Sequence, residues 1–303
     1  MARKISIGTW AFGVYSEDPL DFTAVLDRIA ALDFDGVELG AFEPHPDPAG
    51  CATLEQRAEL ERMFSERGLK VSAVATGFED AGFLRDDDNS AYLSAVNRNL
   101  DFCAAIGAQR LIVNTGDTPE APSEVGEEAA YERLITTWRE ASELAASRGL
   151  ALTWEFEPCW SFNEPAQVIR IAKELAGPGF GVCYDTAHGH TVAAIGARHV
   201  NGPKPLAGGQ VEFLDELKGT INHVHLLDSD GTIVDHSDSS EQTTQHVPFG
   251  RGEIDFEAVM PALVAAGGDT EWWTVDLCFW PDAWQATEES KRYVDELAAT
   301  YAP

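Results

Sequence analysis

The sequence predicts an α/β fold, a single (β/α)8 barrel that spans residues 1–303. Short apolar segments alternate eight times with segments of helical periodicity. The apolar segments are hydrophobic almost throughout, as expected for parallel strands that are buried on both faces. The alternative is an open doubly wound sheet, but no Gly-x-Gly-x-x-Gly motif follows a predicted strand.

The first half of the chain supplies four strand–helix units. Pro19-Leu20-Asp21 is a plausible helix start, and a glycine follows three of the four helices, as is common at helix C-termini. The predicted strands are 4–9, 36–40, 69–75 and 110–114, the predicted helices are 19–33, 53–67, 90–106 and 124–148, and the terminal glycines are Gly68, Gly107 and Gly149.

The second half repeats the unit with two longer connections. A Gly/Pro-rich insert at 196–209 is either a subunit contact or slack chain, and the long polar loop 229–251, which holds His236 and His246, is predicted to be a substrate lid or a partner surface. The predicted strands are 150–156, 180–185, 221–227 and 271–276, and the predicted helices are 165–175, 211–217, 256–266 and 282–300.

Composition and charge restrict the class of protein. The chain is 44% hydrophobic, enough for a substantial core, and it carries 51 acidic against 21 basic residues, for a net charge of -30. Such a field repels phosphate backbones, so nucleic acid is not an expected partner. The five cysteines form no Cys-x-x-Cys pair, and no export signal or membrane-spanning segment is evident, so we expect a soluble cytoplasmic protein with free thiols.

Acidic and imidazole side chains stand where several predicted strands end. The apolar run 180–184 leads into Asp185, and His188 follows three residues later. Glu155 ends an earlier apolar run, Asp276 ends the last one, and His225 lies in the seventh predicted strand. In a barrel these four strand ends converge at the C-terminal mouth, where active sites lie. For Asp185 and His188 alone, the alternative is a helix-capping carboxylate and a surface histidine.

The whole chain resembles the sugar isomerase/epimerase superfamily of xylose isomerase-like TIM barrels. The motifs that carry the resemblance follow one another in order. They are Val37-Glu38-Leu39, Trp154-Glu155, Asp185-Thr-Ala-His188, His223-Val-His225-Leu-Leu-Asp228 and Gly250-Arg-Gly252-Glu-Ile-Asp255-Phe.

The resemblance implies one divalent metal ion held by Glu155, Asp185, His225 and Asp276. Oxygen donors with one imidazole suit Mn2+ first, with Mg2+, Co2+ or Zn2+ as alternatives. Such a metal stabilises the enediolate that forms when a proton leaves the carbon beside a carbonyl. Glu155 or Glu157 can take that proton. His188 is implied to contact a sugar-like substrate without binding the metal. His188 and Asp276 are further catalytic candidates.

Two positions depart from the family's 3-epimerases. The fourth ligand is usually glutamate, but here it is Asp276, whose side chain is shorter and could bind loosely. These epimerases also carry an arginine where this chain has Gly231. Both departures favour isomerisation, or elimination of water or of a keto-glycoside's aglycone, over epimerisation by two opposed bases.

Other residues have both a functional and a structural interpretation. His223 is expected to be a core histidine on the opposite side of the strand from His225. Arg251 and a set of aromatic residues are candidates for substrate binding, although the aromatic residues could equally pack the barrel rim. The aromatic candidates are Trp10, Phe12, Trp160, Trp280 and Trp284.

For the assembly, the alternatives are a homo-oligomer and a complex with another subunit. For the function, two rivals remain. Relatives of endonuclease IV place extra histidines on early strands, but the runs 71–76 and 111–115 hold none. A non-catalytic binding barrel is the other possibility. Converging acidic groups without a cation would repel one another, which argues against it.

Overall fold

The computed structural model describes residues 3–13, 20–77, 82–85, 87–235, 242–267, 270–278 and 280–301. Within them the predicted barrel is confirmed: eight parallel strands close in the order β1-β10-β7-β6-β5-β4-β3-β2. The strands are β1 (Lys4–Gly8), β2 (Gly36–Gly40), β3 (Lys70–Ala75), β4 (Arg110–Val113), β5 (Ala151–Glu155), β6 (Phe180–Asp185), β7 (Ile221–Leu226) and β10 (Trp272–Val275).

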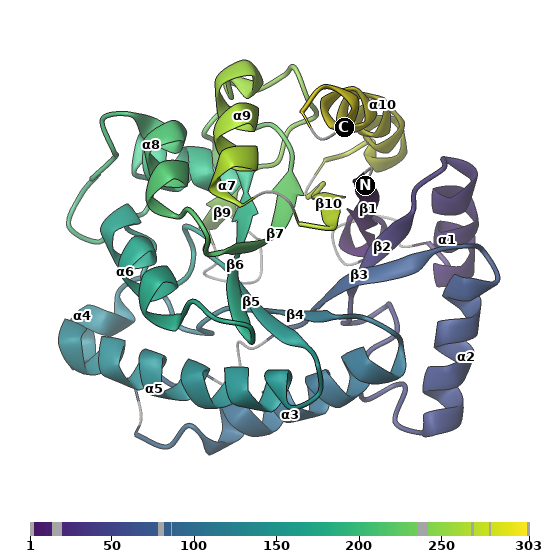
Figure 1. Ribbon diagram of the computed structural model, residues 1–303, viewed down its shortest axis with the longest axis horizontal. Coiled ribbons are helices and arrows are strands. Elements are labelled where there is room, and N and C mark those ends of the chain that lie inside the picture. The colour runs from purple at the N-terminus through teal and green to yellow at the C-terminus, as the bar shows by residue number, and fades with distance from the viewer. Residues whose placement is uncertain are drawn as a thin grey trace.

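Helices surround the barrel strands (Figure 1). The α-helices are α1 (Phe22–Ala31), α2 (Leu54–Ser65), α3 (Ser90–Ala105), α4 (Ala121–Val125), α5 (Glu127–Ala146), α6 (Pro165–Leu175), α7 (Thr186–Gly189), α8 (Gly209–Glu216), α9 (Phe256–Ala266) and α10 (Ala283–Tyr301). A 3-10 turn, η1 (Thr9–Phe12), follows β1, and a π-helical segment, η3 (His190–Ile195), follows α7.

Local side-chain chemistry sets several helix boundaries. Asp21 accepts a hydrogen bond from the Ala24 N–H, so α1 begins at Phe22, slightly later than predicted. Thr53 and Gln56 form a reciprocal capping box at the start of α2. The single helix predicted over 124–148 is instead α4 and α5, because Gly126 adopts φ 97° between them and interrupts helical geometry.

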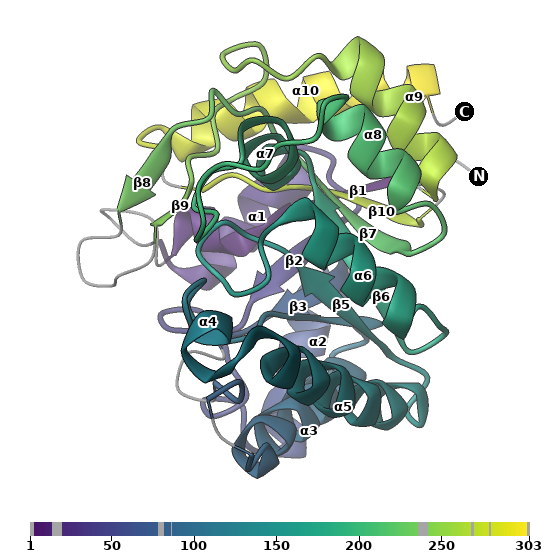
Figure 2. The same ribbon diagram turned by 90° about the vertical axis from the view of Figure 1, so that its left-hand side faces the viewer.

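The loop predicted over 229–251 contains an antiparallel hairpin, β8 (Ile233–Asp235) and β9 (Gln242–Thr244). Figure 2 shows this hairpin at the end of the barrel away from the N-terminus, which is the end toward which the barrel strands run. The role of this segment as a substrate lid or a partner surface stays a prediction. His236 lies outside the described residues.

Beyond the hairpin, the chain is fastened to the end of β7. The buried Asp228 carboxylate accepts hydrogen bonds from the N–H groups of Gly250, Gly252 and Ile254. These three bonds return the chain to the barrel, and α9 begins shortly after them. The insert 196–209 runs between η3 and α8, and the Leu206 N–H bonds the Ala193 carbonyl 2.8 Å away.

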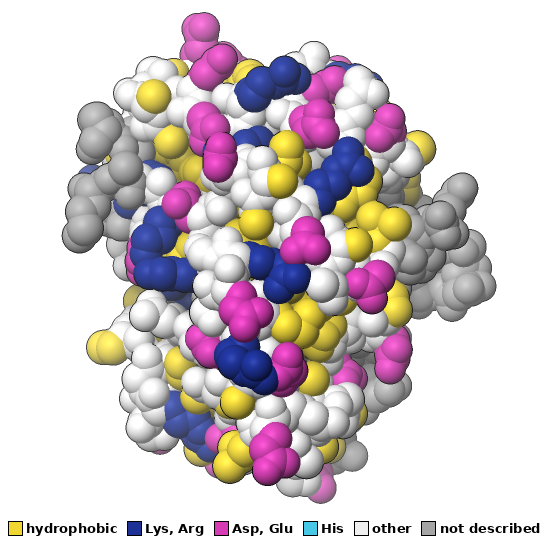
Figure 3. Space-filling model, turned by 90° about the vertical axis from the view of Figure 1, so that its right-hand side faces the viewer, with side chains coloured by type: hydrophobic (Ala, Val, Ile, Leu, Met, Phe, Trp, Pro, Cys, Tyr) yellow, Lys and Arg dark blue, Asp and Glu magenta, His cyan; other side chains and the backbone are white. Residues whose placement is uncertain are grey.

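The face shown in Figure 3 interleaves acidic, basic and hydrophobic side chains, without a large patch of one kind. Ion pairs link neighbouring helices, as between Arg170 and Glu128 at 2.7 Å and between Lys173 and Glu216 at 2.7 Å. Of the helices in the described part of the chain, none has the length and apolar character needed to cross a membrane.

Candidate active site

Four strand ends bring the predicted ligand residues together. Glu155 and Asp185 are the last residues of β5 and β6, and His225 is the residue before the end of β7. Asp185 pairs with His225 in the parallel register, and Asp276 directly follows β10. Each side chain is therefore delivered by a rigid strand to the same mouth of the barrel.

The ligand atoms of these residues lie within 4.8 Å of one another. From His225 Nδ1, the distance to Glu155 Oε1 is 2.7 Å, to Asp276 Oδ2 3.3 Å and to Asp185 Oδ2 4.0 Å. Adjacent ligands of an octahedral Mg2+-sized cation are about 3 Å apart, since each lies about 2.1 Å from the ion. The spacing is close to that of a divalent-metal shell.

The polar atoms that face this point lack hydrogen-bond partners. Among the described residues, Glu155 Oε1, Asp185 Oδ2 and His225 Nδ1 are buried and make no hydrogen bond of acceptable geometry. Buried carboxylate and imidazole atoms rarely remain unpaired unless something else binds them. Their orphaned state and their oxygen-rich chemistry fit a hard divalent cation.

His188 and Glu157 stand beside this cluster. α7 begins directly after Asp185, whose Oδ1 accepts the His188 backbone N–H at 2.6 Å, so the predicted first helical turn is present. The His188 Nε2 atom lies 3.6 Å from Glu157 Oε2. The hairpin holds both side chains in place, because Thr244 Oγ1 lies 3.1 Å from His188 Nδ1 and Thr243 donates to Glu157 at 2.8 Å.

Burial changes the acidity of the carboxyl groups. It raises the pKa of Glu157 to about 8, and the charge of Glu155 adds to the effect. It also raises the pKa of Asp185 to about 7, against the lowering charge of His246. Glu157 is thus a carboxyl group that can exchange a proton near neutral pH, as a general base or acid must.

Asp276 is enclosed by polar partners. Its Oδ1 accepts hydrogen bonds from Trp10 Nε1 at 2.8 Å and from Cys278 Sγ at 3.2 Å. His246 Nδ1 donates to the Asp276 backbone carbonyl at 2.7 Å, which leaves the buried His246 Nε2 without a hydrogen-bond partner. Burial would raise the pKa of Asp276, but His246 and His225 hold it well below its usual range.

His246 is a site residue that the sequence assigned only to a loop. It is 1% exposed, and its ring centroid lies 5.0 Å from that of His188. Burial would lower its pKa, but Asp276 and Asp185 raise it to about 10. No sequence signal marks it, because its position depends on the way the hairpin folds back over the strand ends.

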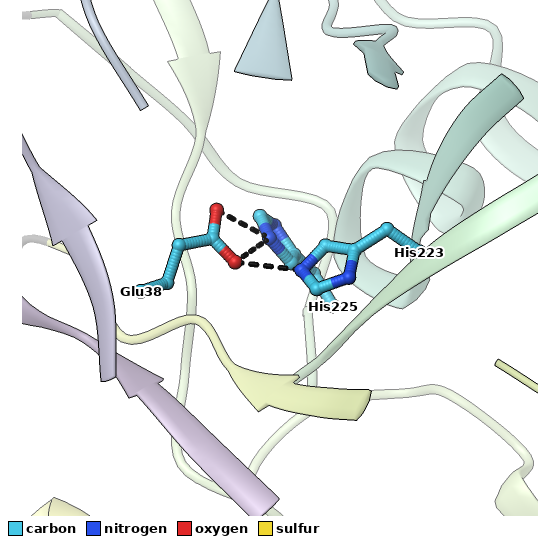
Figure 4. A group of neighbouring side chains, drawn as sticks. All are labelled: Glu38, His223 and His225. Carbon is cyan, nitrogen blue, oxygen red and sulfur yellow. Dashed lines mark hydrogen bonds and ion pairs between the residues drawn. The ribbon is translucent and has the colours of Figure 1, made fainter. Parts of the chain in front are cut away.

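His223 is a buried core histidine, as predicted, but its predicted orientation is wrong. Residues two apart in a strand face the same side, so His223 and His225 both point into the barrel. There both imidazoles contact Glu38 of β2, a fully buried carboxylate (Figure 4). Glu38 belongs to the motif Val37-Glu38-Leu39, but sequence reasoning assigned it no chemical role; an acid in the middle of an apolar strand was the available signal.

The aromatic candidates divide between the site and the packing around it. Trp10 contacts Asp276, and Trp160 Nε1 donates to Glu157 Oε1 at 3.2 Å, so both border the cluster. Phe12 is 1% exposed and stacks on Trp284 at 3.9 Å between ring centroids, which places this pair in the packing against α10.

Arg251 lies on the surface rather than among the cluster. Its guanidinium is 5.4 Å from the ring centroid of Trp280, and its side chain lies 3.5 Å from the Glu289 carboxylate. These contacts give Arg251 and Trp280 a structural role at α10. A contact of either residue with substrate stays a prediction.

The backbone at Gly231 disfavours the arginine found in the family's 3-epimerases. Gly231 adopts φ 79°, a conformation that L-residues rarely adopt. A Cβ there would lie 2.3 Å from Ile195 Cδ1. The departure seen in the sequence is therefore built into the path of the chain after β7.

The family is decided by a match of the model for the xylose isomerase-like TIM barrel to residues 26–297. The chain belongs to this family. No curated protein matches the sequence.

Solved structures show the same fold at low identity. A 3-keto-D-glucoside 4-epimerase, YcjR, from E. coli is 18% identical with a TM-score of 0.68, over 97% of this chain and 99% of that one. The probable 3-DHS dehydratase AsbF from Bacillus anthracis is 12% identical with a TM-score of 0.70, over 96% and 98%. A xylose isomerase-like TIM barrel protein from Mycobacterium smegmatis, in complex with magnesium, is 13% identical with a TM-score of 0.70, over 100% and 98%.

Proposed function

We propose that this protein is a divalent-metal-dependent enzyme that removes a proton from the carbon beside the carbonyl of a sugar or keto-sugar. The observation that carries the proposal is the convergence of Glu155, Asp185, His225 and Asp276, whose ligand atoms lie within 4.8 Å of one another. Family membership supports it, as do the solved relatives named as an epimerase and a dehydratase.

A divalent cation bound there, with Mn2+ as the first candidate, would stabilise negative charge on the substrate's carbonyl oxygen. Glu157 is the proposed base, because its carboxylate is outside the ligand set and its pKa is raised to about 8 by burial and by Glu155. Glu155 is the alternative base. The proton moves from carbon to the carboxylate, and the C–H electron pair moves toward the carbonyl to form an enediolate.

The fate of that electron pair determines the product. Return of the proton to the neighbouring carbon gives an isomer, and expulsion of a β-leaving group gives an elimination product. We place isomerisation first and elimination second, since the named dehydratase shares the fold. Epimerisation by two opposed bases is less well supported, because Asp276 accepts hydrogen bonds from Trp10 and Cys278 and the backbone at Gly231, with φ 79°, disfavours the arginine.

Metal removal tests the proposal. The protein is treated with a chelator, dialysed, and assayed on candidate keto-sugars in D2O with and without added Mn2+, Mg2+, Co2+ or Zn2+. We expect chelation to abolish turnover and Mn2+ to restore it, with solvent deuterium at the reacting carbon. The Asp185→Asn protein should not recover. Full turnover by the chelated protein would refute the metal dependence.

His188 is proposed to bind a substrate hydroxyl rather than the metal. It is buried beside Glu157, and its Nδ1 is engaged by Thr244. The His188→Ala protein should keep its Mn2+ content, measured by elemental analysis, while turnover falls by about 100-fold or more, as for loss of a proton-handling or positioning group. Loss of the metal from this variant would place His188 among the ligands instead.

A further inference from the structure

A layer of polar side chains lies inside the barrel. Of the proposed metal ligands, it contacts His225. The Glu38 carboxylate reaches from β2 to β7, where His223 Nε2 lies 2.7 Å from Oε2 (Figure 4). His225 Nε2 lies 3.0 Å from Oε2 and 3.1 Å from Oε1, so it faces both carboxylate oxygens. The three side chains are fully buried.

Strand irregularities accompany this contact. The pairing of β2 with β3 changes register between Val37 and Leu39, on either side of Glu38. The pairing of β6 with β7 changes register between Val182 and Cys183, and Cys183 is the residue that pairs with His223. Such irregularities redirect side chains and are frequent beside active sites.

The intervening strands complete the layer. In the barrel order, β1 and β10 lie between β2 and β7. Thr274 of β10 donates a hydrogen bond to Glu38 Oε2 at 3.1 Å, and Ser6 of β1 bonds the Thr274 hydroxyl at 2.8 Å. Glu38 therefore accepts hydrogen bonds from two imidazoles and one hydroxyl, which matches the acceptor capacity of a carboxylate.

We propose that Glu38 is a positioning residue that selects the tautomer of His225. Glu38 accepts a hydrogen bond from the Nε2–H of His225, which keeps the proton on Nε2. The lone pair of Nδ1 is then directed toward the carboxylates of Glu155 and Asp276, at 2.7 Å and 3.3 Å. The inference rests on the proposed function, because the cation proposed there is what Nδ1 would bind. Partners on the remote nitrogen of a ligand histidine fix its tautomer and ring orientation in this manner.

The geometry makes the Glu38→Gln substitution a sharp test. Either orientation of the introduced amide places an NH2 group where one carboxylate oxygen now stands. Both oxygens lie within 3.1 Å of His225 Nε2, so an NH2 group in place of either one leaves a single, neutral acceptor for the Nε2–H. The weaker acceptor no longer fixes the tautomer, and a ring that is protonated at Nδ1 cannot bind a metal through that atom.

Metal affinity gives the first readout. Titration calorimetry with Mn2+ alone should show a dissociation constant about 10–100-fold weaker in Glu38→Gln than in the unmodified protein. Thr274→Val is the matched control, because it removes the hydroxyl contact and retains the carboxylate with both imidazoles. We expect its Mn2+ affinity to stay near that of the unmodified protein. Equal affinity in Glu38→Gln would overturn the proposal.

The histidine tautomer gives a readout that a loss of packing would not reproduce. Long-range 1H–15N spectra of the Mg2+-loaded protein should show His225 protonated at Nε2, and Thr274→Val should show the same pattern. Glu38→Gln should show a shift toward protonation at Nδ1. If Glu38→Gln does not fold, the unmodified protein still decides: an Nε2 atom without a proton contradicts the proposal.

The two proposals fail in different ways. Tight Mn2+ binding by the unmodified protein with no change in Glu38→Gln refutes the role of Glu38 and leaves the metal site intact. Absence of Mn2+ binding by the unmodified protein refutes both, since the tautomer of His225 would then have no cation to serve.

Discussion

At the scale of single residues, hydrogen bonds hold the side chain of Asp276, the proposed fourth ligand, in place. The sequence suggested that Asp276 could bind loosely because aspartate is shorter than glutamate. The structure shows its Oδ1 hydrogen-bonded by Trp10 and Cys278, while Oδ2 lies 3.3 Å from His225 Nδ1. These contacts restrict the position of the Asp276 carboxylate.

We therefore expect Asp276→Glu to lower turnover by about 100-fold at saturating Mn2+. The added methylene moves the carboxylate by about 1.5 Å, and displacements on the order of 1 Å can cost that much. Initial rates on the keto-sugar substrate measure the effect. Asp282→Glu is the control, because the same change occurs at an exposed position on the protein surface. A faster Asp276→Glu enzyme that inverts one stereocentre would favour epimerisation by two bases.

The sequence located the residues whose position depends on strand ends alone. Glu155, Asp185 and Asp276 end apolar runs, His225 lies close to the end of another, and the barrel brings strand ends together without further information. Glu38 and His223 required knowledge of which side chains meet across the interior. The position of His246 depends on how the hairpin before it folds back over the strand ends, which the sequence does not display. Periodicity within one segment does not indicate which residues of different segments lie close together.

At the scale of elements, the segment between β7 and α9 is held by hydrogen bonds to one carboxylate, that of Asp228. Asp228 accepts three backbone N–H groups from 250–254, and a Cβ on Gly252 would lie 2.2 Å from Asp228 Oδ1. This attachment fixes the end of the segment that carries the hairpin and His246. The hairpin threonines that hold His188 and Glu157 depend on the same segment.

Gly252→Ala should destabilise this attachment. The carboxylate must move away, and we expect the free energy of unfolding to fall by more than about 2 kcal/mol, in the range for broken buried hydrogen-bond networks. Urea denaturation measures it. Gly177→Ala is the control, since the nearest heavy atom to its Cβ would be 3.8 Å away, and its effect should stay within about 0.5 kcal/mol. Equal stabilities of the two variants would contradict the expectation.

Element boundaries show the same limit of local information. The helix start at Phe22 follows from a capping aspartate that the sequence displays, and the prediction was close. The break at Gly126 was missed, because one glycine within a helical pattern is usually tolerated. The hairpin β8–β9 was missed because its strands, Ile-Val-Asp and Gln-Thr-Thr, are only three residues each, too short to show an apolar alternation.

At the scale of the whole molecule, acidic pH acts on stability in two opposite directions. Protonation of surface carboxylates reduces the net charge of -30 and so relieves self-repulsion. Histidines buried in neutral form oppose folding at low pH, because the unfolded chain protonates first. His45 is such a residue: it is 4% exposed, packs against Phe22 with ring centroids 5.0 Å apart, and has a buried Nε2 with no hydrogen-bond partner among the described residues.

His45 should make a measurable contribution to this pH dependence. Burial lowers its pKa from 6.5 to about 4. Between these values the unfolded state binds a proton that the folded state does not, so stability falls as pH decreases through 6.5 and the loss levels off below 4. The full effect is up to about 3 kcal/mol.

Replacing His45 by glutamine removes this titration while all other groups titrate as before. Urea denaturation of both proteins from pH 7 to pH 4, in the presence of a chelator, should therefore show the stability advantage of the unmodified protein shrinking toward pH 4. A difference that stays constant with pH would show that His45 is protonated as easily in the folded protein as in the unfolded chain.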